Sequence, residues 1–223
     1  GSDGTAWAWG YNGYGQLGDN AIMAQGTPVS VLGAHSFIRM AAGYYFSIAI
    51  RGSDGTAWAW GYNGYGQLGN NTTTNYSTPV SVAGGHSFIE VSAGEHHAMA
   101  LKKDGSIWIW GNNNYYQLGL AFQGGTRPST NRNPFFVGGP IPGPYYKAMV
   151  ASAYFTLLVR TDDSILACGN NTYGQLGNNT TTSYSSPISI VGGDVFPILV
   201  AGRYSSYGIK ADGTAWAWGN NSY

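Results

Sequence analysis

Charged residues are scarce in this chain of 223 residues, which has 10 Lys and Arg, 10 Asp and Glu, and a formal net charge of zero. Their share is 9%, against about 25% in a typical soluble domain. Nucleic acids and anionic membrane surfaces are bound through basic patches, so this composition argues against both as partners. No apolar run approaches the roughly 20 residues that a membrane span requires, which argues against membrane insertion.

Cysteine and histidine are also scarce. The single cysteine, Cys168, cannot form an internal disulfide, and there are four histidines. Two of these, His96 and His97, are adjacent on a predicted strand and would point to opposite faces, so they are not expected to bind a metal. The acidic pair Asp162 and Asp163 falls at a predicted hairpin turn, like most of the carboxylates. We therefore expect no enzyme activity, catalytic residue, metal or cofactor.

What the sequence has in abundance is repetition. The segment Gly1 to Gly18 recurs without change from Gly52 to Gly69. The glycine that follows the second tryptophan position lies at 10, 61, 111, 169 and 219, which gives spacings of 51, 50, 58 and 50 residues. A period near 50 residues, with short alternating segments and glycine-rich turns, predicts the four-stranded antiparallel blades of a β-propeller.

Each period is expected to contain the same succession of elements. A strand led by proline comes first, as in 28–31 and 79–82, followed by an Ala-Gly pair, an apolar strand and an Asp-Gly turn. The returning strand reads Thr-Ala-Trp-Ala-Trp-Gly, so its two tryptophans face one way and its two alanines the other, and large residues face small ones between blades. The predicted structural core comprises Trp7, Trp9, Trp58, Trp60, Trp108, Trp110, Leu166, Cys168, Trp216 and Trp218.

The order Ala-Gly, short strand, Asp-Gly, Trp-x-Trp-Gly and Tyr-Gly-Gln-Leu-Gly resembles the repeat of the regulator of chromosome condensation family. Its Gln-Leu-Gly element recurs at 16–18, 67–69, 117–119 and 175–177, and the resemblance covers essentially the whole chain. It implies an all-β propeller, which in that family usually has seven blades. The Gly-x-Gly-x-x-Gly pattern at 64–69 also matches a dinucleotide-binding fingerprint. That fingerprint requires a helix directly after it, and none is expected here, so we expect no nucleotide-binding site.

We expect a single repeat domain over residues 1–223. Four periods favour an incomplete part of a larger propeller of about seven blades, with a closed four-bladed ring and a ring completed by a second chain as alternatives. The expected units are a partial first blade at 1–20, repeats at about 21–69, 70–119 and 120–177, and a last partial blade at about 178–223.

Departures from the repeat indicate where specific recognition can be built. The residues that follow each Ala-Gly or Ala-Ser pair vary in charge while staying largely aromatic, which favours one loop per blade displayed on a common rim. The third period is eight residues longer than its neighbours, and its proline-rich loops carry further basic and aromatic residues. The candidate partner-binding residues are Tyr44, Tyr45, Glu95, His96, Tyr154, Arg203 and Tyr204 on the rim, with Arg127, Arg132 and Tyr145 in the long period.

The leading hypothesis is a non-enzymatic interaction or structural module that displays loops to a protein partner. Further copies of the chain, or the rest of its own chain, are among the candidate partners. The uncharged composition favours an extracellular, cell-surface or virion-surface location. Two alternatives are glycan binding, because exposed tyrosine and asparagine stack on and hydrogen-bond to sugars, and guanine-nucleotide exchange, which the family resemblance implies.

Overall fold

The computed structural model describes residues 3–33, 35–119, 130–137 and 146–222, and its secondary structure over these residues consists of β-strands. Glycine-rich turns interrupt the alternating apolar segments at short intervals, which keeps the strands short. The strands are β1 (Trp7–Gly10), β2 (Gln25–Ser30), β3 (Phe37–Ala42), β4 (Phe46–Arg51), β5 (Ala57–Gly61), β6 (Tyr76–Ser81), β7 (Glu90–Ala93), β8 (His97–Leu101), β9 (Ile107–Asn112), β10 (Thr130–Val137), β11 (Tyr146–Ala151), β12 (Phe155–Arg160), β13 (Ile165–Gly169), β14 (Tyr184–Ser189), β15 (Ile198–Ala201), β16 (Ser205–Ile209) and β17 (Ala215–Gly219).

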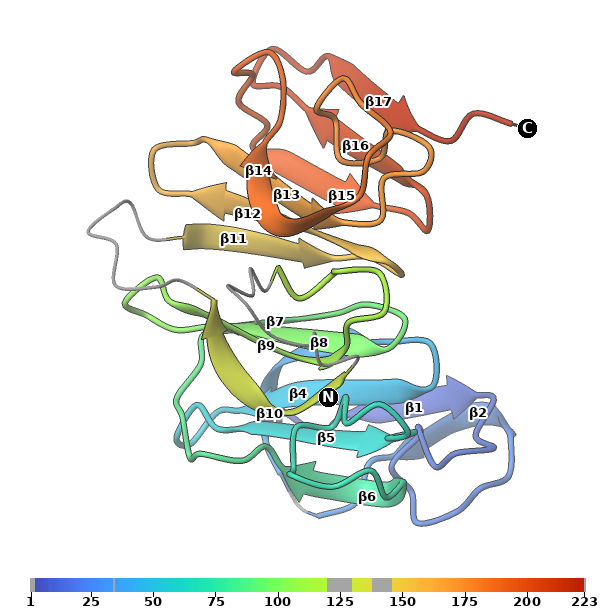
Figure 1. Cartoon of the computed structure of the whole chain (residues 1–223). Coiled ribbons are helices and arrows are strands. Elements are labelled where there is room, and N and C mark those ends of the chain that lie inside the picture. The colour runs from blue at the N-terminus through green and yellow to red at the C-terminus, as the bar shows by residue number, and fades with distance from the viewer. Residues whose placement is uncertain (1–2, 34, 120–129, 138–145, 223) are drawn as a thin grey trace.

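The strands form a succession of antiparallel sheets, which runs from β1 and β2 in blue to β17 in red (Figure 1). Three sheets have four strands each, in the orders β3-β4-β5-β6, β7-β8-β9-β10 and β11-β12-β13-β14. The sheets at the two ends, β1-β2 and β15-β16-β17, have two and three strands within the described residues. The first strands of successive sheets, β3, β7, β11 and β15, lie next to one another. This architecture confirms the predicted all-β propeller of four-stranded antiparallel blades.

The proline-led strands close the sheets instead of opening the blades. Pro79 lies on β6, which pairs with β5, and β14 pairs with β13 in the same way. As the last strand of its sheet, β6 leaves one edge unpaired, where a residue without an N–H group is tolerated. Each sheet therefore ends on the strand that begins the next period. The predicted unit ranges 1–20, 21–69, 70–119, 120–177 and 178–223 follow the sequence period and are offset by one strand from the sheets.

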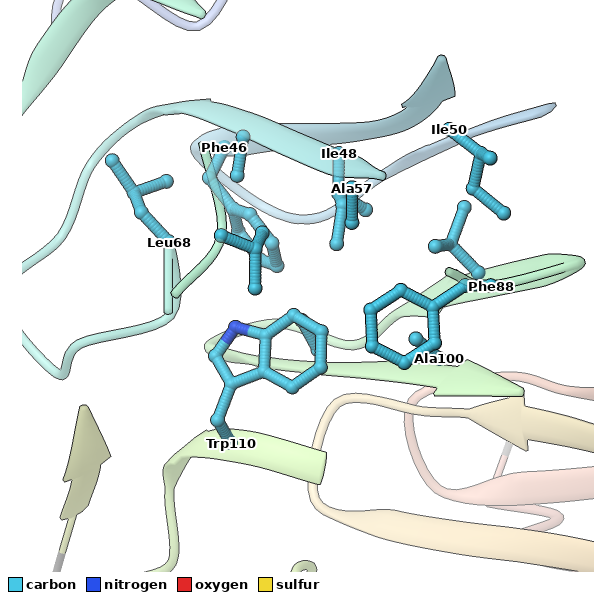
Figure 2. Close-up of a cluster of buried hydrophobic side chains, with 12 residues drawn as sticks. Phe46, Ile48, Ile50, Ala57, Leu68, Phe88, Ala100 and Trp110 are labelled. Carbon is cyan, nitrogen blue, oxygen red and sulfur yellow. The ribbon is translucent and has the colours of Figure 1, made fainter. Parts of the chain in front are cut away.

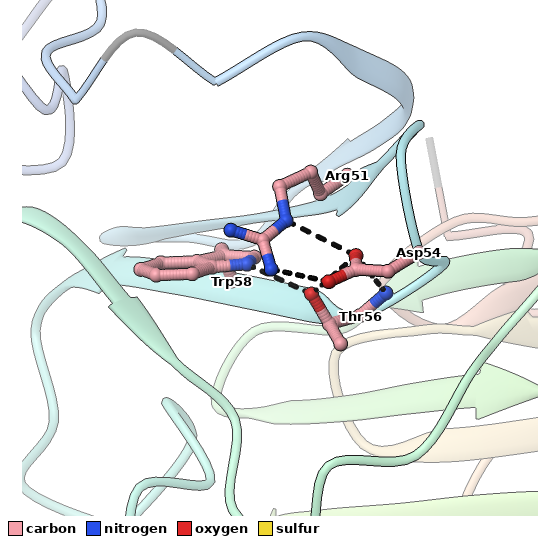
Figure 3. A network of polar contacts seen from close by, with 4 residues as sticks. All are labelled: Arg51, Asp54, Thr56 and Trp58. Carbon is pink, nitrogen blue, oxygen red and sulfur yellow. Dashed lines mark hydrogen bonds and ion pairs between the residues drawn. The ribbon is translucent and has the colours of Figure 1, made fainter.

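The Asp-Gly turns hold the hairpins in register. Asp54 accepts hydrogen bonds from the backbone N–H and the hydroxyl of Thr56, at 3.0 and 2.8 Å, while Gly55 takes the positive φ that this turn requires. Arg51 pairs with Asp54 and lies over the ring of Trp58, 5.0 Å from its centroid (Figure 3). The Arg51 guanidinium and the Thr56 donors hold the pKa of Asp54 well below its ordinary value.

Between neighbouring sheets, tryptophan packs against alanine as the alternation predicts. Trp110 on β9 is fully buried against the preceding sheet, where it meets Phe46, Ile48 and the small residues Ala57 and Ala59 (Figure 2). Three indoles at this position of the repeat donate their Nε1–H to the carbonyl oxygen of a Gln-Leu-Gly segment in the preceding period. These pairs are Trp60 to Gln16 at 2.9 Å, Trp110 to Gln67 at 2.9 Å and Trp218 to Gln175 at 3.0 Å.

Three of the predicted core tryptophans are exposed, because burial depends on what packs against the strand that carries them. Trp7 and Trp9 on β1 are 52% and 64% exposed, since no sheet of the described chain packs on their side. Trp216 on β17 is 49% exposed, although Lys210 lies 4.0 Å from its ring centroid. The rings of His35 and His86 cover the equivalent Trp58 and Trp108. Beside Trp216, the position of this histidine is taken by Asp194, which has no ring to cover the indole.

The fourth copy replaces the tryptophan pair by two smaller buried residues. Leu166 and Cys168 are 6% and 1% exposed. The Cys168 thiol lies 3.9 Å from the Gln117 carbonyl oxygen, the acceptor that an indole takes in the other copies. Burial raises the pKa of Cys168 to about 12, so the thiol stays protonated and packs as a small apolar group.

Buried asparagines organise the polar turns, a role that the sequence did not predict. The Asn63 side chain is fully buried; its Nδ2 lies within 3.1 Å of the Asn70 side-chain oxygen and of the carbonyl oxygens of Thr72 and Thr74. Its Oδ1 accepts a hydrogen bond from the Leu68 backbone at 2.9 Å. The only signal in the sequence was the recurrence of asparagine five residues before the leucine of Gln-Leu-Gly.

Replacing this asparagine should destabilise the protein clearly. Asn63→Ala leaves the buried Leu68 N–H and two carbonyl groups without their partner, so we expect the free energy of unfolding to fall by about 2–3 kcal/mol. The matched control is Asn114→Ala, because Asn114 is exposed. Urea denaturation followed by circular dichroism measures both changes, and equal stability of the two variants would contradict this role of Asn63.

Candidate interaction surface

Four sheets meet where their innermost strands end. β3, β7, β11 and β15 each end in alanine, and the residues that follow line a hollow of about 360 Å³ between the sheets. We call this hollow the channel mouth. It is lined by Ala42-Gly43-Tyr44, Ala93-Gly94-Glu95, Ala151-Ser152-Ala153 and Ala201-Gly202-Arg203.

Small residues are required at the channel mouth because the backbones approach closely. A Cβ atom on Gly94 would lie 2.1 Å from the Ser152 carbonyl oxygen, well inside van der Waals contact. In one copy serine replaces this glycine, and the Ser152 hydroxyl donates a hydrogen bond to the Gly202 carbonyl oxygen of the next sheet at 2.6 Å. These contacts hold the positions of neighbouring sheets at the channel mouth. They also place the third residue of each lining segment beside it.

A group of aromatic rings borders one part of the channel mouth. Tyr44 and Tyr45 have ring centroids 4.2 Å apart, and Tyr14 packs on Tyr45 at 4.9 Å. The group continues from Tyr14 to Tyr62 at 5.0 Å and from Tyr62 to His96 at 5.9 Å. Tyr44 is 58% exposed, so it offers ring surface to solvent.

A second aromatic group lies farther along the same series of blades. Tyr154 packs on Tyr115 at 4.6 Å and on Tyr204 at 5.5 Å, and Tyr173 lies 5.3 Å from Tyr204. Arg203 lies over Tyr154, 5.3 Å from its centroid. We call the two groups together the tyrosine belt, which consists of Tyr11, Tyr14, Tyr44, Tyr45, Tyr62, Tyr65, His96, Tyr115, Tyr154, Tyr173 and Tyr204.

Glu95 joins the two groups. Its carboxylate lies 3.3 Å from the Arg203 guanidinium, 3.5 Å from the Tyr154 hydroxyl and 3.5 Å from His96 Nε2. Burial lowers the pKa of His96, although Glu95 acts in the opposite direction. The imidazole is therefore neutral at pH 7, and Arg203 is the cation that balances Glu95.

The phenol groups of Tyr45 and Tyr154 also stay neutral near pH 7. A hydrogen bond with Tyr44 raises the pKa of Tyr45 to about 12, and burial raises the pKa of Tyr154. The surface thus presents ring faces and hydroxyl groups, with one compensated ion pair at its centre. Such a surface is suited to binding, because aromatic rings give rigid contact area and hydroxyls give adaptable hydrogen bonds.

The structure brings together the seven rim residues named from the sequence, which are Tyr44, Tyr45, Glu95, His96, Tyr154, Arg203 and Tyr204. Arg127 and Tyr145 lie outside the described residues. Arg132 was assigned to a loop but lies on β10, because its segment pairs with β9. Four tyrosines of the belt were not predicted, although their recurrence in the turn before Gln-Leu-Gly was a signal: Tyr14, Tyr65, Tyr115 and Tyr173.

His97 points into the core rather than to the rim. It is completely buried at the position that Phe46 and Phe155 take in other sheets. Its Nε2 lies 3.2 Å from the Thr156 hydroxyl, which itself donates to the Gln117 carbonyl oxygen at 2.8 Å, so Nε2 carries the proton and donates to Thr156. Burial lowers the pKa of His97 to about 3.

Within the described part of the chain, the structure shows neither a metal site nor a membrane-spanning helix. No cluster of three or more His, Cys, Asp and Glu side chains there could hold a metal ion. Nor does that part contain a helix with the length and apolarity to cross a bilayer.

Comparisons with known proteins agree with this architecture. A family model described as RCC1-like domain matches residues 1–223. The chain is 25% identical to the ultraviolet-B receptor UVR8 of Arabidopsis thaliana, over 97% of this chain and 49% of the receptor. It is 29% identical to the human E3 ubiquitin-protein ligase HERC2, over 86% of this chain and 4% of the ligase.

Solved structures show the same fold. Yeast RCC1 (Prp20), in a crystal structure with Kap60, superposes with a TM-score of 0.83 at 21% identity, covering 98% of this chain and 52% of that one. Human WBSCR16 superposes with a TM-score of 0.81 at 19% identity, covering 96% of this chain and 57% of that one. This chain therefore spans about half the length of these propellers. With its repeats, its blades and the match over its whole length, the chain belongs to the RCC1-like domain family.

Proposed function

We propose that this chain is a non-enzymatic protein-interaction module whose partner contacts the tyrosine belt around the channel mouth. The observation that carries the proposal is the continuity of the belt. Rings contributed by different sheets lie 4.6 to 6.2 Å apart within each group, and Glu95 and Arg203 connect the two groups. The repeat scaffold fixes the position of each ring, so binding orders few side chains.

Two properties of the surface favour a protein as the partner. Tyrosine and arginine are enriched at the centres of protein interfaces, where they supply most of the binding energy. Arg203 is 56% exposed while Glu95 is 14% exposed, so the arginine remains accessible to an acceptor on a partner. Related propellers are described with protein partners, namely Kap60 for yeast RCC1 (Prp20), and Gsp1p and histones for Prp20.

The proposal is tested by affinity capture with three forms of the chain. These are the wild type, the belt variant Tyr44→Ala/Arg203→Ala, and the control Met23→Ser, which removes an exposed apolar side chain outside the belt. Extract proteins bound by the wild type and the control, but lost with the belt variant, support the proposal. For each such protein, we expect the belt variant to raise Kd at least ~10-fold. Capture of the same proteins by all three forms would contradict it.

Two experiments distinguish the alternative functions, glycan binding and guanine-nucleotide exchange, from protein binding. Glycan binding predicts specific signals on a glycan array that the belt variant loses. Guanine-nucleotide exchange predicts faster nucleotide release from a purified small GTPase. The exposed rings of the belt are the feature that a sugar would also use.

A further inference from the structure

The contact between the sheets β7-β8-β9-β10 and β11-β12-β13-β14 differs from the other contacts between sheets. We call it the histidine interface. At the other interfaces an indole donates to the carbonyl oxygen of a Gln-Leu-Gly segment. At the histidine interface Cys168 takes the place of that indole, and its thiol lies 3.9 Å from the Gln117 carbonyl oxygen. The packing there comes from a buried aliphatic cluster that includes Met99, Leu118, Leu158 and Leu166.

A histidine supplies a polar contact across this interface. His97 on β8 is completely buried, and its Nε2–H donates to the Thr156 hydroxyl on β12 at 3.2 Å. Thr156 in turn donates to the Gln117 carbonyl oxygen at 2.8 Å, so one hydroxyl serves both contacts. At the position of His97 the two neighbouring sheets carry Phe46 and Phe155. An ionisable ring therefore stands here where the neighbouring sheets have a neutral one.

The other ring nitrogen of His97 lies in a place that does not suit a second proton. Its Nδ1 is buried and has no hydrogen-bond partner among the described residues. The ring edge that carries Nδ1 packs on Gly94, where an added Cβ would lie 2.5 Å from this nitrogen. Protonation in the closed interface would therefore bury an unpaired charge, which is strongly unfavourable unless the ring reaches water.

The neighbouring titratable groups do not compensate such a charge. At this end of the two sheets, the turns and strands around His97 carry Glu95, His96, Tyr115, Tyr116, Tyr154 and Cys168. Glu95 is the one acid among them, and Arg203 already balances it at 3.3 Å. The group whose charge acts on His97 is His96, which lowers the pKa of His97 further.

We propose that acidification opens the histidine interface, so that the part from β1 to β10 and the part from β11 to β17 come apart there while each sheet stays folded. In a repeat architecture each unit contacts only its neighbours, so a charge at one interface weakens that interface and leaves the others in place. The opening also divides the tyrosine belt, because Glu95 lies on one side and its partners Tyr154 and Arg203 lie on the other. It does not depend on the proposed function, because it is a property of the scaffold.

The direction of the effect follows from the proton that His97 gains. Burial lowers the pKa of His97 to about 3 in the closed interface, against about 6.5 for an imidazole in water. The open state therefore binds a proton that the closed state does not bind, and opening is favoured as the pH falls below about 6.5. Between pH ~7.5 and pH ~5 the equilibrium constant for opening should rise about 30-fold.

Cys168 reports the opening, because it is the single cysteine of the chain and is 1% exposed at this interface. The measurement is the rate at which its sulfur attacks dithiodipyridine, an aromatic disulfide that reacts at acid pH; a mixed disulfide forms and one pyridinethione leaves. Each rate is divided by that of the chain unfolded in urea at the same pH, which removes the effect of thiol ionisation. We expect this ratio to rise about 30-fold from pH ~7.5 to pH ~5, while circular dichroism shows that the sheets remain folded.

Two variants show whether the effect belongs to His97 and to this interface. His97→Phe carries the ring that the neighbouring sheets have, and its ratio should stay nearly constant with pH. Cys168→Ala/Ala59→Cys moves the reporter to the buried interface beside Trp110 and keeps His97, and its ratio should also stay nearly constant.

A ratio that does not rise in the wild type would overturn the proposal, and so would an equal rise in His97→Phe. An equal rise at the moved reporter would overturn it as well, because the whole chain would then loosen rather than this interface. That comparison needs no change at His97, so it decides the matter even where His97→Phe fails to fold.

Discussion

Trp110→Ala is expected to lower the free energy of unfolding by about 3–5 kcal/mol, whereas the same substitution at Trp7 should cost about 0.5 kcal/mol or less. Trp110 is fully buried between two sheets and donates to the Gln67 carbonyl oxygen. Truncation removes that contact and opens a cavity, while Trp7 is 52% exposed and leaves no comparable void. Trp7 takes the first and Trp110 the second tryptophan position of the repeated strand motif, so the comparison contrasts an exposed indole with a fully buried one.

Urea denaturation followed by far-ultraviolet circular dichroism measures both changes. All variants are measured at the same low protein concentration, because any association of folded chains would change the apparent stability. A large loss at Trp7, or a small loss at Trp110, would contradict the packing of tryptophan on the preceding sheet as the main contact between blades.

His97→Phe is expected to protect the protein against acid. The pKa of His97 is about 3 in the folded chain and about 6.5 in an unfolded one. Between these values the unfolded state binds one more proton than the folded state, so stability falls as the pH drops below about 6.5. The slope is about 1.4 kcal/mol per pH unit, which amounts to about 3 kcal/mol at pH ~4.5. Phenylalanine, which other sheets carry at this position, removes that contribution.

The measurement compares unfolding free energies at pH ~7.5 and pH ~4.5 for wild type, His97→Phe and His35→Phe. The control is chosen because His35 is only partly buried, although burial lowers its pKa as well. We expect the loss on acidification to shrink by about 3 kcal/mol in His97→Phe and much less in the control. Equal losses in wild type and His97→Phe would show that His97 does not titrate in this way.

The fold was largely predictable from the sequence, because the repeat fixes both the strands and the faces they bury. The period near 50 residues and the alternation of tryptophan with alanine led directly to four-stranded blades with large residues packed on small ones. The exposure of Trp7 and Trp9 was not predictable from this motif. Identical strands differ in burial because burial is a property of the neighbouring sheet, which alternation within one strand does not describe.

The candidate site was predictable only in part. Variation after each Ala-Gly pair identified Tyr44, Glu95 and Arg203, because these positions break a regular pattern. Tyr14 and Tyr62 were missed, since they belong to the repeated turn segment before Gln-Leu-Gly and enter the belt only through contacts between rings. The burial of His97 follows from its alignment with Phe46, a signal that was present in the repeat.

Hydrogen exchange of the chain, with and without a protein captured through the belt, tests whether a partner contacts the channel mouth and its rim. We expect slower exchange there when the partner is bound, in the segments 43–46, 94–97, 152–155 and 202–205. Slower exchange confined to the outer strands β6 and β14, with these four segments unchanged, would contradict the assignment of the tyrosine belt as the partner-binding surface.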